Sequence, residues 1–137
     1  MIDQKYATPE KIKTYRDLIV WSKSIDFVTM VYELTRKYPK DELYGLTLQI
    51  RRCAISIPSN IAEGYGRRST QDYIRFLQIA MGSLYEIQTQ IQISLNLKFI
   101  SQIDYNSIYE KSRQIEIMLR LLIEKIKSSR FSNNSVL

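Results

Sequence analysis

Histidine is missing from this chain of 137 residues, and cysteine occurs once, as Cys53. The chain therefore lacks the commonest general base, both the Ser–His and the Cys–His nucleophile pairs, and the ligand that most zinc and di-iron carboxylate sites use. A single cysteine excludes an internal disulfide and fits a reducing compartment, and its neighbours predict a buried, inert thiol. From these absences we expect a protein that is not an enzyme and that binds no metal or other cofactor.

Long apolar runs are absent too, because none approaches the roughly 20 residues that a membrane span requires. The first residues, MIDQKYATPEKIKTY, are polar and of mixed charge, unlike a signal or transit peptide. We therefore expect a cytoplasmic protein with no membrane partner.

Glycine (4 residues) and proline (3 residues) are scarce, and few breakers in a chain of this length indicate long helices. Hydrophobic residues make up 45% and charged residues 25%, as in ordinary globular domains. We expect one folded domain at 15–128, flanked by a flexible arm at 1–14 and a flexible tail at 129–137. The net charge of +6 suits either a basic solvated surface or a site for a polyanion.

The spacing of apolar residues predicts helices and no strands. The expected helices cover about 17–38, with Asp17 as N-cap, then 41–64, 69–97 and 101–128. Ser69 and Ser101 are each followed three residues later by an aspartate, the spacing of a capping box. Four helices without strands predict an all-α fold class. Because the links between the helices are short, we expect an antiparallel up-down-up-down four-helix bundle.

The apolar faces are wider than a single helix seam requires. In the first helix, one stripe holds Leu18, Trp21, Ile25, Val28 and Tyr32, and a second stripe holds Phe27, Val31 and Leu34. The second and third helices each carry a second row as well, Leu48, Ile55 and Ala62 in one and Ile74, Met81 and Gln88 in the other.

The stretch IPSNIAEGYGRRS, residues 57–69, interrupts this regular pattern. Apolar register continues through Pro58, which predicts one kinked helix instead of two. Gly64 and Gly66 then offer positions that can adopt a positive φ and end the helix. Because these glycines follow a helix, with no strand before them, the stretch is not a phosphate-binding loop.

Structural roles are expected for the other unusual residues nearby. Glu63 is placed to pair with Arg67 at i,i+4 or to cap a neighbouring helix. Ser59 and Asn60 are expected to satisfy backbone groups that the proline exposes. Pro58 cannot donate to the carbonyl of Ala54, so that carbonyl requires water or a side chain. Gly82 and Ser83, in the middle of the third helix, are expected to let a partner helix pass closely.

Arginines are the candidate binding residues. Arg51, Arg52, Arg67, Arg68 and Arg75 give five positive charges, with no lysine, between residues 51 and 75. The planar guanidinium suits bidentate binding of phosphate or carboxylate. For each arginine the alternative is a solvated side chain or an intramolecular ion pair. Arg51 and Arg52 lie about four turns before Arg67, so the two pairs can converge only through packing or oligomerisation.

Three segments together resemble a known family: DLIVWSKS, YGLTLQIRRCAISIPSNIAEGYGRRS and DYIRFLQIAMGSLYEIQTQI. They are similar to the 23S ribosomal RNA intervening-sequence proteins, bacterial four-helix bundles distantly related to the accessory protein of diversity-generating retroelements. The resemblance covers about residues 15–127. The positions that match the family pattern are Trp21, Gln49, Arg51, Arg52, Pro58, Asn60, Glu63, Gly64, Arg75, Gly82, Ser83 and Glu86. Cys53, where alanine is common, and the tail after Lys127 depart from it.

The resemblance implies a homo-oligomer, typically a pentameric ring, with basic surfaces that bind nucleic acid and with no catalytic residues. The retroelement relative binds its reverse transcriptase and nucleic acid. A ring would use the second apolar stripes as subunit interfaces and would collect several copies of each arginine cluster.

Two functions follow as hypotheses. The first is a non-catalytic, oligomeric protein that binds RNA or DNA through phosphates, without an interleaved aromatic motif for base stacking, and therefore in a salt-sensitive way. The alternative is a scaffold whose basic face docks a polymerase-like or other nucleic-acid-processing protein. The third hypothesis is a hydrolase, which is disfavoured because the chain has no histidine and no metal-ligand spacing.

Overall fold

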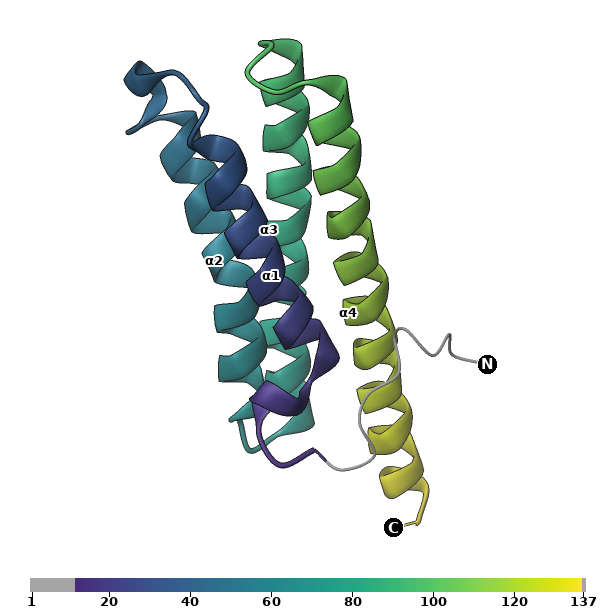
Figure 1. Ribbon diagram of the computed structural model, residues 1–137. Helices are drawn as coiled ribbons and strands as arrows, with labels where there is room; N and C mark the ends of the chain where they lie inside the picture. The colour runs from purple at the N-terminus through teal and green to yellow at the C-terminus, as the bar shows by residue number, and fades with distance from the viewer. Residues whose placement is uncertain (1–11, 137) are drawn as a thin grey trace.

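The computed structural model describes the backbone of residues 12–136 and the side chains of residues 12–129. Two short 3-10 turns, η2 (Tyr15–Asp17) and η3 (Lys40–Glu42), accompany four α-helices: α1 (Ile19–Thr35), α2 (Leu46–Tyr65), α3 (Thr70–Asn96) and α4 (Gln102–Val136). No strand occurs in this part of the chain. The helices run up and down alternately, and α2 packs on α1 and α3 while α4 packs on α3 and α1 (Figure 1). The predicted four-helix bundle is confirmed.

Side-chain caps begin three of the four helices. The hydroxyl oxygen of Ser69 accepts a hydrogen bond from the Asp72 amide at 3.1 Å, and that of Ser101 accepts one from the Asp104 amide at 3.1 Å. The carboxylate of Glu42 accepts a bond from the Leu46 amide at 3.0 Å and so caps α2 from the preceding turn. Each cap satisfies a backbone donor that has no partner inside its own helix.

The first helix begins differently from the prediction. The Asp17 carboxylate turns backward and accepts hydrogen bonds from the amides of Lys13 and Thr14, at 2.8 and 3.1 Å. These bonds complete a capping box with Thr14 on η2, so the prediction that Asp17 caps α1 is wrong. Leu18 holds the N-cap position of α1 without a side-chain bond.

The bounds of ordered structure near the two ends of the chain also differ from the predicted helix bounds. Ile12 packs against the core, whereas residues 1–11 of the predicted arm lie outside the described part. Helix α4 continues to Val136, beyond the predicted end near Ser128. After Ser101 the sequence holds neither proline nor glycine, so no breaker stops this helix.

Gly64 and Gly66 were predicted to end α2 by adopting a positive φ, and neither does so. Gly64 lies inside the helix, and Gly66 is the C-cap with a right-handed φ of −78°. Among the described residues, the positive φ belongs to Lys98, at 63°, in the turn between α3 and α4. The prediction that α2 runs through Pro58 as a single helix is confirmed.

The two apolar stripes of α1 are buried to different extents. Phe27 and Val31 are buried at 1% and 0% exposure and join the central cluster. In the other stripe Leu18 is buried at 3% exposure, but Trp21 and Val28 are only partly buried and Ile25 is exposed, so most of that stripe lies at the margin of the bundle. No helix within residues 12–136 is both long enough and apolar enough to cross a lipid bilayer.

Candidate nucleic-acid interface

Arg67 and Arg75 share one aromatic ring beside the turn that links α2 to α3. Their guanidinium carbons lie 4.5 and 4.8 Å from the centroid of the Phe76 ring. Both distances are within the range of a cation–π interaction. The ring is buried at 8% exposure, so it anchors two positive charges, one from the turn after α2 and one from α3.

Each of these guanidiniums also has an acidic neighbour. Arg67 pairs with Glu63 at 3.8 Å, as predicted, and Arg75 pairs with Asp72 at 3.7 Å. All four side chains are between 47% and 60% exposed, and such surface pairs contribute little stability. A guanidinium has five donors, so a long contact of this kind leaves donors free for another anion.

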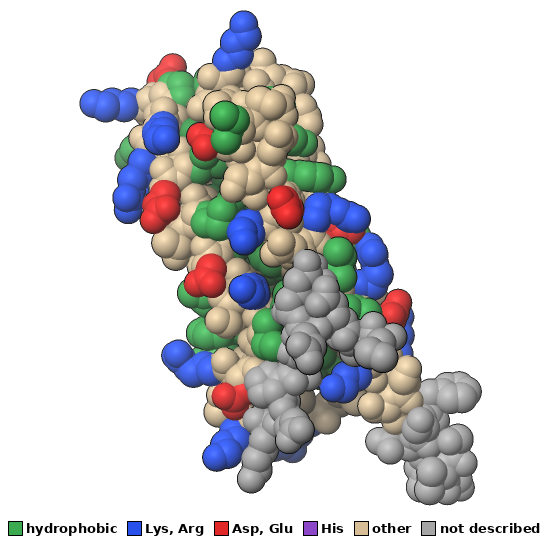
Figure 2. All heavy atoms as spheres, turned by 45° about the vertical axis from the view of Figure 1, so that its right-hand side comes forward, with side chains coloured by type: hydrophobic (Ala, Val, Ile, Leu, Met, Phe, Trp, Pro, Cys, Tyr) green, Lys and Arg blue, Asp and Glu red, His purple; other side chains and the backbone are tan. Residues whose placement is uncertain are grey.

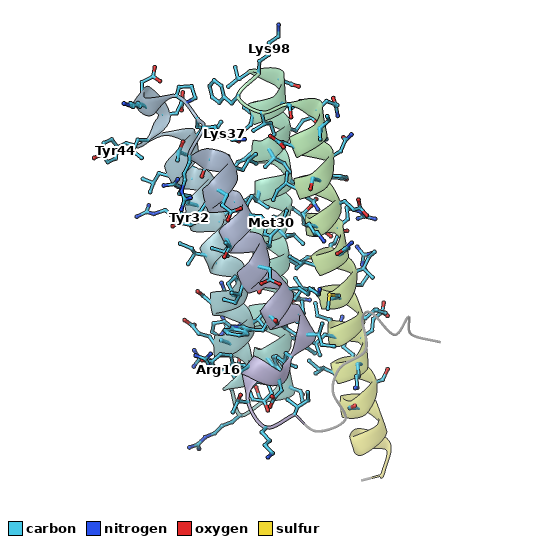
Figure 3. The ribbon with its side chains drawn as sticks, viewed as in Figure 1. Arg16, Met30, Tyr32, Lys37, Tyr44 and Lys98 are labelled. Carbon is cyan, nitrogen blue, oxygen red and sulfur yellow. The ribbon has the colours of Figure 1, made fainter. Side chains whose placement is uncertain are left out.

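Two further arginines lie at this end of the bundle. Arg68 is exposed in the turn next to Arg67. Arg16, which the sequence analysis did not select, comes from η2 and stands over the rings of Tyr15 and Trp21 at 5.6 and 5.2 Å (Figure 3). Its signal in the sequence was its position between these two aromatic residues.

Arg51 and Arg52 lie nearer the opposite end. From Arg51 to Tyr65, the last residue of α2, the helix rises about 21 Å at 1.5 Å per residue, and Arg67 follows in the turn beyond it. Arg51 donates to the Thr35 hydroxyl at 2.9 Å and stacks on the Tyr32 ring at 4.5 Å. The fold therefore brings Arg67, Arg68 and Arg75 to one end, here called the arginine cluster, and leaves Arg51 and Arg52 apart from it.

The motif residues of the seam between α2 and α3 are structural. The Asn60 side chain donates to the carbonyl and to the hydroxyl oxygen of Ser56, at 2.7 and 2.9 Å. Ser56 in turn bonds Ser83 across the seam at 2.8 Å, which agrees with a packing role for Ser83. Asn60 therefore satisfies a backbone carbonyl near the proline, that of Ser56.

Gly82 does not serve the predicted helix contact inside the chain. It is exposed, and a Cβ added there would meet no atom within 4 Å. The close approach occurs at Gly64 instead, where an added Cβ would lie 2.8 Å from the Cβ of Phe76.

Cys53 is buried at 8% exposure, and its thiol donates to the Glu86 carboxylate at 3.1 Å. Burial, with a further contribution from Glu86, raises the pKa of the thiol to about 11. A thiol of that pKa is almost wholly protonated near neutral pH, which agrees with the inert cysteine expected. No cluster of three metal-ligating side chains occurs within the described residues.

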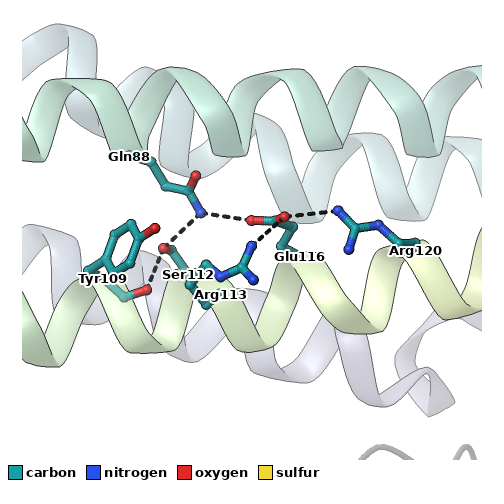
Figure 4. Close-up of polar contacts among 6 residues, drawn as sticks. All are labelled: Gln88, Tyr109, Ser112, Arg113, Glu116 and Arg120. Atoms are coloured by element: carbon teal, nitrogen blue, oxygen red, sulfur yellow. Dashed lines mark hydrogen bonds and ion pairs between the residues drawn. The ribbon is translucent and has the colours of Figure 1, made fainter.

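A buried carboxylate between α3 and α4 was not foreseen from the sequence. Glu116 is 3% exposed and accepts hydrogen bonds from Gln88, Arg113 and Arg120 at 3.1, 2.6 and 3.0 Å (Figure 4). Burial opposes its ionisation, but these donors outweigh burial and lower its pKa. The network of these two arginines and one carboxylate carries a net charge of +1.

An apolar groove opens between α1 and α2. It has a volume of about 330 Å³ and is called the α1/α2 groove here; its lining is Tyr15, Trp21, Ile25, Val28, Ile55, Pro58, Ser59 and Ala62. Ile25 and Ile55 remain 39% and 43% exposed.

Charges of both signs are mixed on the face of the molecule in Figure 2. Lysine and arginine side chains alternate there with aspartate and glutamate and do not form one basic patch.

These features define a class, that of small all-helical bundles with an arginine cluster at one end and an open apolar groove. Residues 16–121 match the family described as 23S rRNA-intervening sequence protein, and this chain belongs to that family. A similar solved structure is that of a protein with unknown function from the S23 ribosomal protein family of Bacteroides thetaiotaomicron. The two sequences are 27% identical, the TM-score is 0.71, and the alignment covers 76% of this chain and 97% of that one. A search among curated proteins gives no match.

Proposed function

We propose that this chain is a non-catalytic, homo-oligomeric protein that binds nucleic acid, RNA above all, through the phosphate backbone. The observation that carries the proposal is the arginine cluster, in which Arg67 and Arg75 share the Phe76 ring and Arg68 extends from the adjoining turn. Arg51 and Arg52 supply a second, separate basic pair. The family description, which refers to 23S rRNA, agrees with an RNA ligand.

The geometry of the arginine cluster favours a phosphate ligand. Stacking on Phe76 limits the rotation of both guanidiniums, so less side-chain entropy is lost when an anion binds. Their present carboxylate partners are distant and exposed, and a phosphate oxygen can replace them at little cost. Phosphate contacts of this kind carry no sequence information, so binding is expected to be indifferent to sequence.

Oligomerisation is supported by apolar surface that one chain leaves open. The α1/α2 groove exposes Ile25 and Ile55, and on the outer side of α3 the side chain of Ile79 is 43% exposed. Two different apolar surfaces favour a head-to-tail contact, which produces a closed ring when the rotation between subunits closes. The resemblance to pentameric relatives adds the expected subunit number, and a ring would present several arginine clusters to one polyanion.

The test is an affinity measurement for a single-stranded RNA across a salt series, combined with the solution mass of the protein with and without RNA. We expect the logarithm of the association constant to fall linearly with the logarithm of salt concentration, because binding releases condensed counterions. Affinity that stays constant across the series, or a mass equal to one chain in both conditions, contradicts the proposal.

A protein scaffold is the alternative, and the α1/α2 groove favours it, because an apolar groove can also receive a helix of a nucleic-acid-processing partner. Replacing Ile25 and Ile55 by aspartate separates the two functions. Loss of a protein partner with RNA binding intact supports the scaffold, whereas loss of assembly together with weaker RNA binding supports the proposed function.

A further inference from the structure

A second groove, between α3 and α4, has a different chemistry from the α1/α2 groove. It has a volume of about 460 Å³ and is called the tyrosine groove here; its lining is Tyr85, Gln88, Thr89, Gln92, Ile93, Tyr105 and Tyr109. Three of these side chains are tyrosines, three others are polar and uncharged, and none is acidic. Tyr85 and Tyr109 remain 45% and 37% exposed.

The aromatic rings of this groove are held in place. Tyr105 and Tyr109 lie one helical turn apart, and their rings are nearly parallel, at 8°, with centroids 5.7 Å apart. The Tyr105 hydroxyl donates to the side-chain oxygen of Gln92 at 2.8 Å, which ties the ring from α4 to α3. The two rings are stacked with parallel faces, so this aromatic platform requires no rearrangement to accept another planar group on the same stack.

Gln88 and Arg113 border the platform with fixed polar groups. The Gln88 amide donates to Ser112 and to the buried Glu116, so its orientation is set by the network of Figure 4. Arg113 follows Tyr109 by one turn of α4, contacts Glu116 through one terminal nitrogen and is 44% exposed. Its other donors are therefore available beside the aromatic platform.

We propose that the tyrosine groove binds unpaired bases of a single-stranded nucleic acid, by stacking on Tyr85, Tyr105 and Tyr109. Amide and hydroxyl groups of Gln92 and Thr89 can bond base edges, and Arg113 can bind the adjoining phosphate. This inference rests on the proposed function and adds to it. The arginine cluster would bind phosphates whether or not bases are attached, and in single strands and duplexes alike, whereas the tyrosine groove requires unpaired bases.

The lining of the groove favours a base over a second copy of the chain. Among the residues that line it, Ile93 is the aliphatic one, and the remainder are tyrosine, glutamine and threonine. A helix of another subunit would require a continuous apolar surface, such as the α1/α2 groove offers. The lining itself contains planar aromatic and amide groups and no carboxylate, and the nearby Glu116 carboxylate is bound to Arg113 and Arg120, so the groove suits a planar, hydrogen-bonding ligand attached to an anionic backbone.

The experiment uses the full chain and three probes of equal length: a single-stranded RNA, an RNA duplex and an oligonucleotide that carries abasic sites throughout. The double variant Tyr85→Leu/Tyr109→Leu removes two rings, and the matched control Tyr85→Phe/Tyr109→Phe removes the hydroxyls but keeps the rings. Fluorescence anisotropy measures each affinity, and circular dichroism compares the folding of both variants.

We expect the wild-type chain and the phenylalanine variant to bind single-stranded RNA about tenfold more tightly than the abasic probe, and the leucine variant to lose that advantage. Ultraviolet crosslinking of the wild-type chain to the single strand should label peptides of α3 and α4, a result that needs no variant to fold. Equal affinity of the wild-type chain for RNA and the abasic probe, with salt-sensitive binding of both, overturns this inference and leaves the proposed function standing. No binding of any probe overturns both.

Discussion

Gly64 lies so close to Phe76 that a methyl group on its Cα would stand 2.8 Å from the Cβ of Phe76. The same methyl would meet the ring of Tyr73 at 3.1 Å and its carbonyl oxygen at 3.2 Å. The end of α2 and the start of α3 therefore approach each other as closely as a glycine permits. Phe76 is also the ring that anchors Arg67 and Arg75, so this contact positions the arginine cluster.

Gly64→Ala should destabilise the protein by about 1–3 kcal/mol, because backbone and ring must move apart. Urea unfolding followed by circular dichroism measures the change. Gly82→Ala is the matched control: an added Cβ there meets nothing within 4 Å, and alanine in an exposed helix interior should stabilise by about 1 kcal/mol. Equal effects of the two substitutions would contradict this account of Gly64.

Neutralising the arginine cluster with Arg67→Gln, Arg68→Gln and Arg75→Gln should weaken RNA binding and reduce the salt slope by about 2, at roughly 0.7 for each lost phosphate contact. The control removes the same charge at the other end of the bundle, with Arg36→Gln, Lys37→Gln and Lys40→Gln, all exposed. If both triple variants change the slope equally, binding depends on net charge and not on the arginine cluster.

Placing a charge in the α1/α2 groove should prevent self-association. Ile25→Asp with Ile55→Asp would bury carboxylates in the proposed subunit contact, at a cost of several kcal/mol. Light scattering after size-exclusion chromatography should then give the mass of a single chain. Ile103→Asp, at a residue that is 80% exposed, introduces a carboxylate outside the groove and should leave the assembly intact.

Cys53 should react slowly with thiol reagents. Burial raises its thiol pKa to about 11 from an ordinary value of 9.0, so at about pH 8 the thiolate fraction falls about a hundredfold. Modification by a chromogenic disulfide should therefore be at least about a hundredfold slower in the folded chain than in urea. Comparable rates in the two states would show that the thiol is neither buried nor protonated as described.

Glu116 should make stability depend on acid pH. Its pKa is lowered in the folded state, so its stabilising effect is complete above the ordinary value of 4.5 and is lost as pH falls through the lower folded pKa. Glu116→Gln should cost about 1–3 kcal/mol at neutral pH and reduce the slope of stability against pH below 4.5. Glu124→Gln, an exposed change on the same helix, should leave that slope unchanged.

Much of the local structure was predictable from the sequence. The Ser69 and Ser101 caps, the continuation of α2 through Pro58 and the pair between Glu63 and Arg67 all occur where expected. These features depend on residues within one helical turn of one another, and their geometry follows from backbone hydrogen bonding alone.

The candidate site was less predictable. The sequence analysis selected five arginines and placed Arg51 and Arg52 about four turns from Arg67. It could not predict that Arg67 and Arg75 meet on the Phe76 ring, or that the Arg51 guanidinium binds Thr35 of another helix. It missed the tyrosine groove, because Tyr85 and Tyr105 are distant in sequence and meet only when α3 and α4 pack antiparallel. The network around Glu116 was missed for the same reason.

The sequence by itself determined that the chain forms long helices, where most of them begin, and that its cysteine is buried. Only the tertiary structure decided which stripe of α1 enters the core, that Gly64 and not Gly82 permits a close helix contact, and which arginines and tyrosines share a surface. The physical reason is that helical register is a local property of the chain, whereas the face that a helix buries depends on the rotation at which distant helices pack.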